Sequence, residues 1–209
     1  MKRKTKVTSG LQNRKPTSLR IIGGAHRGRR LKYNGHRSTR PMRDSVRESL
    51  FNILGDALQD ALIIDPFCGT GILVAEGLSG GAAAAIAMEL DRHAFRQIKE
   101  NLQSLDLLQH VELVAGDSFR GLGRLLETAD RERDWVAVVC PPYEMFSSRI
   151  KDLNRMIRFI AEASPGGSIV VESDRSFDCQ NLEPAGWEIR SYGITQLAIA
   201  SLSSLRQLE

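Results

Sequence analysis

The chain of 209 residues has few cysteines and no long apolar run. Its three cysteines, Cys68, Cys140 and Cys179, stand far apart and form no CxxC pair, so the sequence supports neither a disulfide framework nor a zinc site. No apolar run approaches the roughly 20 residues that a membrane span needs. The basic residues Met1 to Lys6 are not followed by the apolar stretch of a signal peptide. We therefore expect a cytoplasmic protein that binds neither membrane nor metal.

Acidic residues are absent from the first 43 residues. Met1 to Arg43 contain 14 lysines and arginines and no aspartate or glutamate, whereas residues 44–209 contain 15 basic and 25 acidic residues. A basic arm on an acidic body predicts a polyanionic partner, and nucleic acid is the commonest one. For Met1 to Thr17 alone, a solvated tail without a partner is an equal alternative.

Strands and helices alternate along the rest of the chain. Leu19 to Ile22 and Arg29 to Tyr33 flank Gly23-Gly24 and predict a basic β-hairpin. Beyond it, apolar spacing predicts helices at residues 43–54, 72–78, 92–105, 119–128 and 147–163. Short apolar runs predict strands at residues 61–65, 82–89, 111–115, 135–139, 167–172, 187–192 and 196–202, of which the last two form an antiparallel pair.

This alternation indicates a parallel sheet that is covered on both faces by right-handed crossover helices. We therefore predict an α/β fold with a doubly wound, mostly parallel seven-stranded sheet and a basic N-terminal β-hairpin. Ligands of such sheets bind at the carboxyl ends of the strands, near the switch in strand order. The candidate site is therefore formed by the loops that follow Asp65, Met88, Ala115 and Val139.

Three of these loops have the features of a nucleoside pocket. Asp65-Pro-Phe-Cys-Gly-Thr-Gly71 has two glycines that let a ligand approach the backbone at a helix N-terminus. Glu89 ends the next strand, where a carboxylate can accept from ribose hydroxyls. Asp117 ends the third strand, where it could accept from an adenine amine. A dinucleotide fold would have a third small residue at position 74, and Val74 therefore disfavours a dehydrogenase.

Four motifs resemble those of class I S-adenosylmethionine-dependent methyltransferases, which have a Rossmann-like fold. These motifs are, in order, DPFCGTG, MELD, AGDSF and CPPY. The segments LRIIGGAHRGRRL and TRPMRDSVRESLFNIL more narrowly resemble the amino-terminal signature of the bacterial 16S rRNA guanine-N2 methyltransferases, the RsmD family. The resemblance covers about Leu19 to Leu202. It implies methyl transfer from S-adenosylmethionine to the exocyclic N2 amine of a guanosine in 16S rRNA.

The resemblance also implies roles for individual residues. The cofactor S-adenosylmethionine would contact Asp65, Phe67, Gly69 and Gly71 with its methionine portion, Glu89 with its ribose, and Asp117 and Ser118 with its adenine. The flipped target base would meet the reactive methyl over Cys140, Pro141, Pro142 and Tyr143, where Tyr143 stacks on it. The RNA phosphates would be contacted by Arg27, Arg29, Arg30, Lys32, Arg40, Arg43 and Arg47.

The expected organisation has three parts. Residues 1–18 form a basic flexible tail, residues 19–42 a basic hairpin extension that binds RNA, and residues 43–209 the S-adenosylmethionine-dependent methyltransferase domain. The partner is expected to be 16S rRNA or a particle of the assembling small ribosomal subunit, in the course of rRNA processing. The protein itself is expected to be a monomer.

Cys140 stands where amino-methyltransferases with this fourth motif have Asp or Asn. The side-chain oxygen of that residue and a backbone carbonyl would hold the amine, which gains positive charge in the transition state. A neutral thiol is a weak acceptor, and losing a charge-assisted hydrogen bond costs about 1.5–3 kcal/mol, or roughly 10- to 150-fold in rate.

Two functional interpretations therefore stay open. One is an enzyme that uses the carbonyl of Pro141 as the remaining acceptor for the amine. The other is a catalytically weakened or inactive methyltransferase-fold protein that binds rRNA or the assembling small subunit. A DNA or protein amine methyltransferase is a third possibility, which the amino-terminal signature disfavours.

Overall fold

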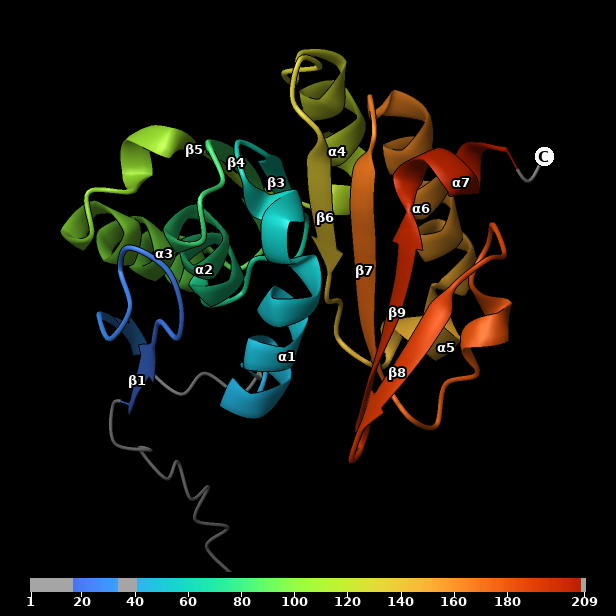
Figure 1. Cartoon of the computed structure of the whole chain (residues 1–209), viewed down its shortest axis with the longest axis horizontal. Helices are drawn as coiled ribbons and strands as arrows, with labels where there is room; N and C mark the ends of the chain where they lie inside the picture. Colours follow the sequence, from blue (N-terminus) through green and yellow to red (C-terminus); the bar gives the residue numbers. More distant parts are fainter. Residues whose placement is uncertain (1–16, 34–40, 208–209) are drawn as a thin grey trace, which may run out of the picture.

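The computed structural model of the chain describes residues 17–33 and 41–207 (Figure 1). Its main sheet has seven strands in the order β5-β4-β3-β6-β7-β9-β8. Five parallel strands form most of it, namely β3 (Leu62–Asp65), β4 (Ala84–Glu89), β5 (Val111–Ala115), β6 (Trp135–Val139) and β7 (Gly167–Asp174). At one side, β9 (Thr195–Ser201) pairs antiparallel with both β7 and β8 (Glu188–Tyr192). The predicted doubly wound, mostly parallel sheet is confirmed.

Helices cover both faces of this sheet. The crossovers contain α2 (Ile72–Ser79), α3 (Arg92–Ser104), α4 (Ser118–Glu127) and α6 (Ile150–Ala163). Three shorter or flanking helices are α1 (Asp44–Leu54), α5 (Met145–Ser148) and α7 (Leu202–Arg206). Single 3₁₀ turns occupy Gly55–Leu58, Leu108–His110 and Cys179–Asn181. None of the helices within the described ranges combines the length and the apolar character that crossing a membrane requires.

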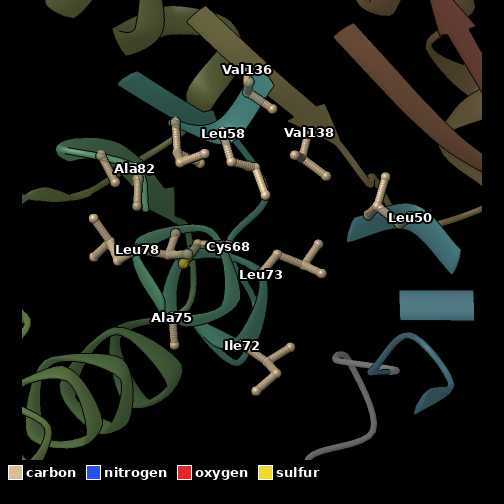
Figure 2. Packing of buried hydrophobic residues seen from close by; sticks show 14 of the residues in the cluster. Leu50, Leu58, Cys68, Ile72, Leu73, Ala75, Leu78, Ala82, Val136 and Val138 are labelled. Carbon is tan, nitrogen blue, oxygen red and sulfur yellow. The ribbon is translucent and has the colours of Figure 1, made fainter. Parts of the chain in front are cut away.

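Two hydrophobic clusters, one on each face, hold the layers together. In β6 every residue is buried, as is typical of a central strand in a parallel sheet. Alternate side chains of this strand enter different clusters: Val136 and Val138 pack with α1, α2 and α3, whereas Trp135 packs with α4 and α6. Figure 2 shows Val136 and Val138 in the first cluster, together with Leu73 of α2 and Leu50 of α1.

The predicted helix at residues 147–163 is two helices. Helix α5 ends at Ser148 and α6 begins at Ile150, because Arg149 between them has a non-helical backbone with φ −138° and ψ 26°. Helix α7, which follows β9 directly, was not predicted. Its Leu202 and Leu205 are buried in the second cluster.

The predicted basic β-hairpin is confirmed, and it stands beside α2 and α3 (Figure 1). Strands β1 (Thr17–Arg20) and β2 (Arg30–Tyr33) pair antiparallel, and the buried Leu31 joins the first cluster. The connection is longer than the predicted Gly23-Gly24 turn and spans residues 21–29. Gly24 has φ +69°, and a Cβ there would lie 1.7 Å from the carbonyl oxygen of Ser79, so this close approach to the end of α2 requires glycine.

A buried ion pair fastens the hairpin and α1 to α2. Nε of Arg47 donates to Oε1 of Glu76 at 2.8 Å, and both side chains are nearly inaccessible to solvent. Glu76 also accepts from the backbone amide of Ile22 at 2.9 Å, while Nη2 of Arg47 donates to the carbonyl oxygen of Arg20 at 2.7 Å. One pair of side chains therefore satisfies the carbonyl of Arg20 and the amide of Ile22, where the hairpin loop leaves β1.

This pair should make a large contribution to stability. Replacing Glu76 by Leu removes the buried counterion of Arg47 and leaves only the exposed Asp44 beside this charge, and breaking a buried pair typically costs about 3–5 kcal/mol of unfolding free energy. The double variant Arg47→Met/Glu76→Leu removes both charges, and its loss should be smaller than the sum of the single losses. Urea denaturation of the wild type, Arg47→Met, Glu76→Leu and the double variant measures this coupling.

The exposed pair Arg190–Glu188 in β8 is a matched control, because solvent screens it. Arg190→Met should leave the urea midpoint almost unchanged. Additive losses for Arg47 and Glu76, or a loss as small as that of the control, would contradict the anchoring role.

Candidate functional site

A cavity of about 700 Å³ lies at the carboxyl ends of the parallel strands. Its walls include Gly69 after β3, Glu89 at the end of β4, Asp117 after β5 and Tyr143 after β6. The strand order changes direction between β3 and β6, and ligands of doubly wound sheets bind at this switch point. The loops that the sequence selected therefore meet in one cavity.

The loop after β3 owes its shape to two glycines. Gly69 and Gly71 have φ values of 57° and 76°, in the left-handed region that other residues rarely adopt. Gly71 is the N-cap of α2, and a Cβ there would lie 3.0 Å from the side chain of Ile98. The amide of Gly69 donates to Oε2 of Glu89 at 2.8 Å, so the end of β4 holds the loop in place.

Glu89 and Asp117 place two carboxylates on neighbouring walls of the cavity. Oε1 of Glu89 accepts from the amide of Asp91 at 2.7 Å, and partial burial raises the pKa of Glu89 despite these backbone donors. Asp117 caps α4, because its Oδ1 accepts from the amide of Phe119 at 3.0 Å. Both carboxylates therefore have fixed positions at the strand ends.

An aromatic wall adjoins the carboxylates. The rings of Phe67 and Phe119 meet edge to face with their centroids 5.6 Å apart, and the guanidinium of Arg149 lies 3.8 Å from the centroid of the Phe119 ring. All three residues line the cavity. Sequence reasoning missed Arg149, which follows no motif, and missed Phe119 although it stands directly after Asp117-Ser118.

The segment Cys140 to Tyr143 forms the wall at the end of β6. Tyr143 is half-buried, and its hydroxyl donates to Oε1 of Glu172 at 3.1 Å. Burial, and then the negative charge of Glu172, raise the pKa of the Cys140 thiol well above its usual value. Cys140 is therefore a neutral thiol, and Glu172, which the sequence did not single out, adds a carboxylate to this wall.

Two of the predicted cofactor contacts are not on the cavity surface. Phe67, Gly69, Glu89, Asp117 and Ser118 line the cavity, as do all four residues from 140 to 143. Asp65, by contrast, is completely buried, and Gly71 turns the backbone into α2. Both residues are set back from the cavity surface, and their contact with a ligand stays a prediction.

Asp65 is an unusual buried acid. Oδ1 accepts from the amide of Phe67 at 3.2 Å, whereas Oδ2 has no hydrogen-bond partner among the residues that the structure describes. Burial raises the pKa of Asp65 from 3.8 to about 7. The ionised form of Asp65 is therefore disfavoured in its buried position.

The predicted RNA-contacting residues divide into three groups. Exposed side chains belong to Arg27, Arg29, Arg30, Lys32 and Arg43. Arg43 lies at the cavity, where its Nη2 donates to the carbonyl oxygen of Tyr192 at 2.8 Å. Arg47 was wrongly predicted to face RNA, because its guanidinium is buried against Glu76. Arg40 and residues 1–16 of the predicted tail lie outside the described residues.

Across residues 17–33 and 41–207, no group of three or more histidine, cysteine, aspartate or glutamate side chains could hold a metal ion.

Comparison with known proteins identifies close relatives. The model of the family described as "Conserved hypothetical protein 95" matches residues 19–201. The protein named "Putative rRNA methyltransferase YlbH" from Bacillus subtilis is 33% identical over 186 residues, which is 87% of this chain and 97% of that protein. "Ribosomal RNA small subunit methyltransferase D" of Escherichia coli K12 is 45% identical over 87 residues, 42% of this chain and 44% of that protein.

Among solved structures, the one titled "Putative methyltransferase yhhF from Escherichia coli" has a TM-score of 0.69 and 28% identity. The match covers 88% of this chain and 98% of that one. The similarity therefore extends over most of the fold.

The buried Asp65 should make stability depend on pH. Its native pKa of about 7 lies above 3.8, so between these values the native state binds more protons than the unfolded chain. The free energy of unfolding then falls as the pH rises through this window. Asp65→Asn keeps the acceptor for the amide of Phe67 but stays neutral at every pH. Its free energy of unfolding, compared with that of the wild type, should therefore rise by up to about 4 kcal/mol between pH 4 and pH 7.

Urea denaturation at several pH values measures this difference. The exposed variant Asp56→Asn is a suitable control, since its stability should follow that of the wild type. A constant difference between Asp65→Asn and the wild type over the whole window would contradict the raised pKa.

Proposed function

The chain belongs to the family described as "Conserved hypothetical protein 95", the RsmD family, and we propose that it transfers a methyl group from S-adenosylmethionine to the N2 amine of a guanosine in small-subunit rRNA. The observation that carries this proposal is one cavity that joins the glycine loop, the carboxylates Glu89 and Asp117, and the Cys140–Tyr143 segment. Relatives that bear the names of rRNA methyltransferases support it.

The lining of the cavity fits S-adenosylmethionine. Its volume of about 700 Å³ is within the usual range of small-molecule sites. Glu89 offers a fixed carboxylate to the ribose hydroxyls, Asp117 and Ser118 offer polar groups to the adenine, and Phe67 and Gly69 border the space for the methionine portion. When bound, S-adenosylmethionine supplies an electrophilic methyl group on a positively charged sulfur.

The residues at the end of β6 would receive the target base. Tyr143 presents an aromatic ring in the wall of the cavity, and a base turned out of its helix stacks on such rings. The Pro141 carbonyl would accept one hydrogen bond from the amine. An acceptor fixed at this position stabilises the positive charge that the amine gains as it reacts, and therefore lowers the barrier.

The hairpin would position the RNA. The backbone of its strand β2 is fastened to α3, because the amide of Lys32 donates to Oδ1 of Asn101 at 2.8 Å and Nδ2 of Asn101 donates back to the Lys32 carbonyl at 2.9 Å. Nη2 of Arg29 donates to the carbonyl oxygen of Ser104 at 3.1 Å. Phosphate contacts from such a platform fix the register of an RNA without reading its sequence.

One observation favours a second candidate function. The neutral thiol of Cys140 replaces the acceptor of the fourth motif, so the chain could bind rRNA or the assembling subunit with weakened or no catalysis.

Methyl transfer distinguishes the two functions. With labelled S-adenosylmethionine, the wild type should methylate 16S rRNA, or small-subunit particles, from bacteria that lack the family's own enzyme. Mapping and nucleoside analysis should locate the label on N2 of one guanosine. Glu89→Ala should lose most of this activity at limiting S-adenosylmethionine, because a ribose acceptor is removed. Label on another atom would overturn the guanine-N2 proposal. Folded protein that binds rRNA but labels neither substrate would favour the second function.

Charge removal from the hairpin tests the RNA surface. The double variant Arg29→Ala/Arg30→Ala should bind 16S rRNA more weakly than the wild type. The slope of log affinity against log salt should fall by about 0.7–0.9 for each phosphate that the variant no longer neutralises. The matched control Lys151→Ala/Arg155→Ala removes two exposed cations from α6 on the other face of the sheet and should leave both quantities almost unchanged. Equal reductions in the two double variants would reject the hairpin as the RNA platform.

A further inference from the structure

Glu172 lies where the carboxylate missing from the fourth motif is needed. We propose that Glu172 of β7, in place of Cys140, is the side chain that accepts a hydrogen bond from the guanine N2 amine during methyl transfer. This inference rests on the proposed function and assigns the acceptor that the sequence of the fourth motif lacks.

The register of the sheet brings the two residues together. Strands β6 and β7 are parallel, and Val139 pairs with Val171, so Cys140 and Glu172 follow at the same level. Val139 and Val171 both enter the second cluster, and alternation therefore directs the next two side chains to the opposite face. Both Cys140 and Glu172 line the cavity together with Tyr143.

Glu172 is held firmly and is largely shielded from water. It is 9% exposed, and the hydroxyl of Tyr143 donates to its Oε1 at 3.1 Å. The ring expected to stack on the base therefore also orients this carboxylate. A carboxylate can accept about four hydrogen bonds, so the Tyr143 hydroxyl does not exhaust its capacity.

Cys140 acts in this arrangement as a donor. Its side chain is hydrogen-bonded to Glu172, whose charge helps to keep the thiol protonated. A protonated thiol beside a carboxylate directs its S–H toward that carboxylate and offers the amine only a weak acceptor. The strong acceptor is thus supplied by Glu172 on β7, at the position adjacent to the end of β6, and not by the first residue of the fourth motif.

The chemistry of the step balances with Glu172 in this role. The N2 lone pair forms a bond to the methyl carbon while the carbon–sulfur bond breaks, and that bonding pair stays on the sulfur. The amine nitrogen becomes positively charged and then loses one proton to the Glu172 carboxylate, which passes it to water. Because the carboxylate is charged and poorly hydrated, it stabilises the developing positive charge more than a thiol would.

Three variants test the proposal in single-turnover reactions with saturating rRNA and S-adenosylmethionine. Glu172→Ala should slow methyl transfer roughly 10- to 150-fold. Glu172→Gln keeps a carbonyl acceptor, so its rate of methyl transfer should lie between that of Glu172→Ala and that of the wild type. Glu162→Ala, the same change on the exposed surface of α6, should react at the wild-type rate. Calorimetry with S-adenosylhomocysteine should give similar affinities for all four proteins.

Rescue separates an acceptor from a purely structural residue. Cys140→Asp alone should give no gain in rate, because two adjacent carboxylates cannot both remain ionised. Combined with Glu172→Ala, the same substitution restores one carboxylate at the site and should recover most of the missing rate. A wild-type rate for Glu172→Ala, or a gain for Cys140→Asp alone with no rescue in the double variant, would overturn the proposal.

A binding measurement keeps this test independent of the proposed function. With S-adenosylhomocysteine present, the wild type should bind an rRNA fragment with guanosine at the target position more tightly than one with inosine, which lacks the amine. Glu172→Ala should lose this preference. If the wild type transfers no methyl group, the proposed function fails, but the guanosine preference still decides the role of Glu172. An undiminished preference in Glu172→Ala would overturn it.

Discussion

The buried ion pair between Arg47 and Glu76 connects the basic hairpin to the helix that begins at the cavity. Glu76 belongs to α2, whose N-terminus is the glycine loop of the cavity and whose C-terminal end contacts the hairpin. Two buried charges without each other would be costly, so α1, the hairpin and α2 are stable only in this arrangement. The exposed cations proposed to bind RNA are therefore fixed relative to the cavity proposed to hold the methyl donor.

The residues that line the cavity gather at one edge of the sheet, because the carboxyl ends of the parallel strands lie there together. Loop glycines, strand-end carboxylates and the Cys140–Tyr143 segment come from four strands that are distant in sequence but adjacent in space. The same geometry allows a function to shift between neighbouring strands. Cys140 and Glu172 occupy equivalent levels on β6 and β7, so a carboxylate on one can replace a carboxylate on the other.

Much of this fold could be predicted from local sequence patterns. Residues 111–115 and 135–139 were predicted to the residue, because short apolar runs with β-branched side chains end at clear turn signals. The helix at residues 147–163 was predicted without its break, since that break lies at Arg149, whose side chain contacts Phe119 from a distant part of the chain.

The candidate site was predictable where a motif marks it and unpredictable where a partner is distant. Glu89 and Asp117 reach the cavity because each follows a strand directly. Arg47 shares a helical spacing with Arg43 and was assigned to a surface, but Glu76, 29 residues away, buries it. No local pattern marks Glu172 either, because only the pairing of β6 with β7 brings it to Cys140.

The central claim is that the cavity is the methyl-donor site, and a crystal structure with S-adenosylhomocysteine tests it most directly. The account predicts the ribose hydroxyls against Glu89 and the sulfur facing the Cys140–Tyr143 segment. Density for the ligand elsewhere, or an empty cavity at saturating ligand, would contradict it.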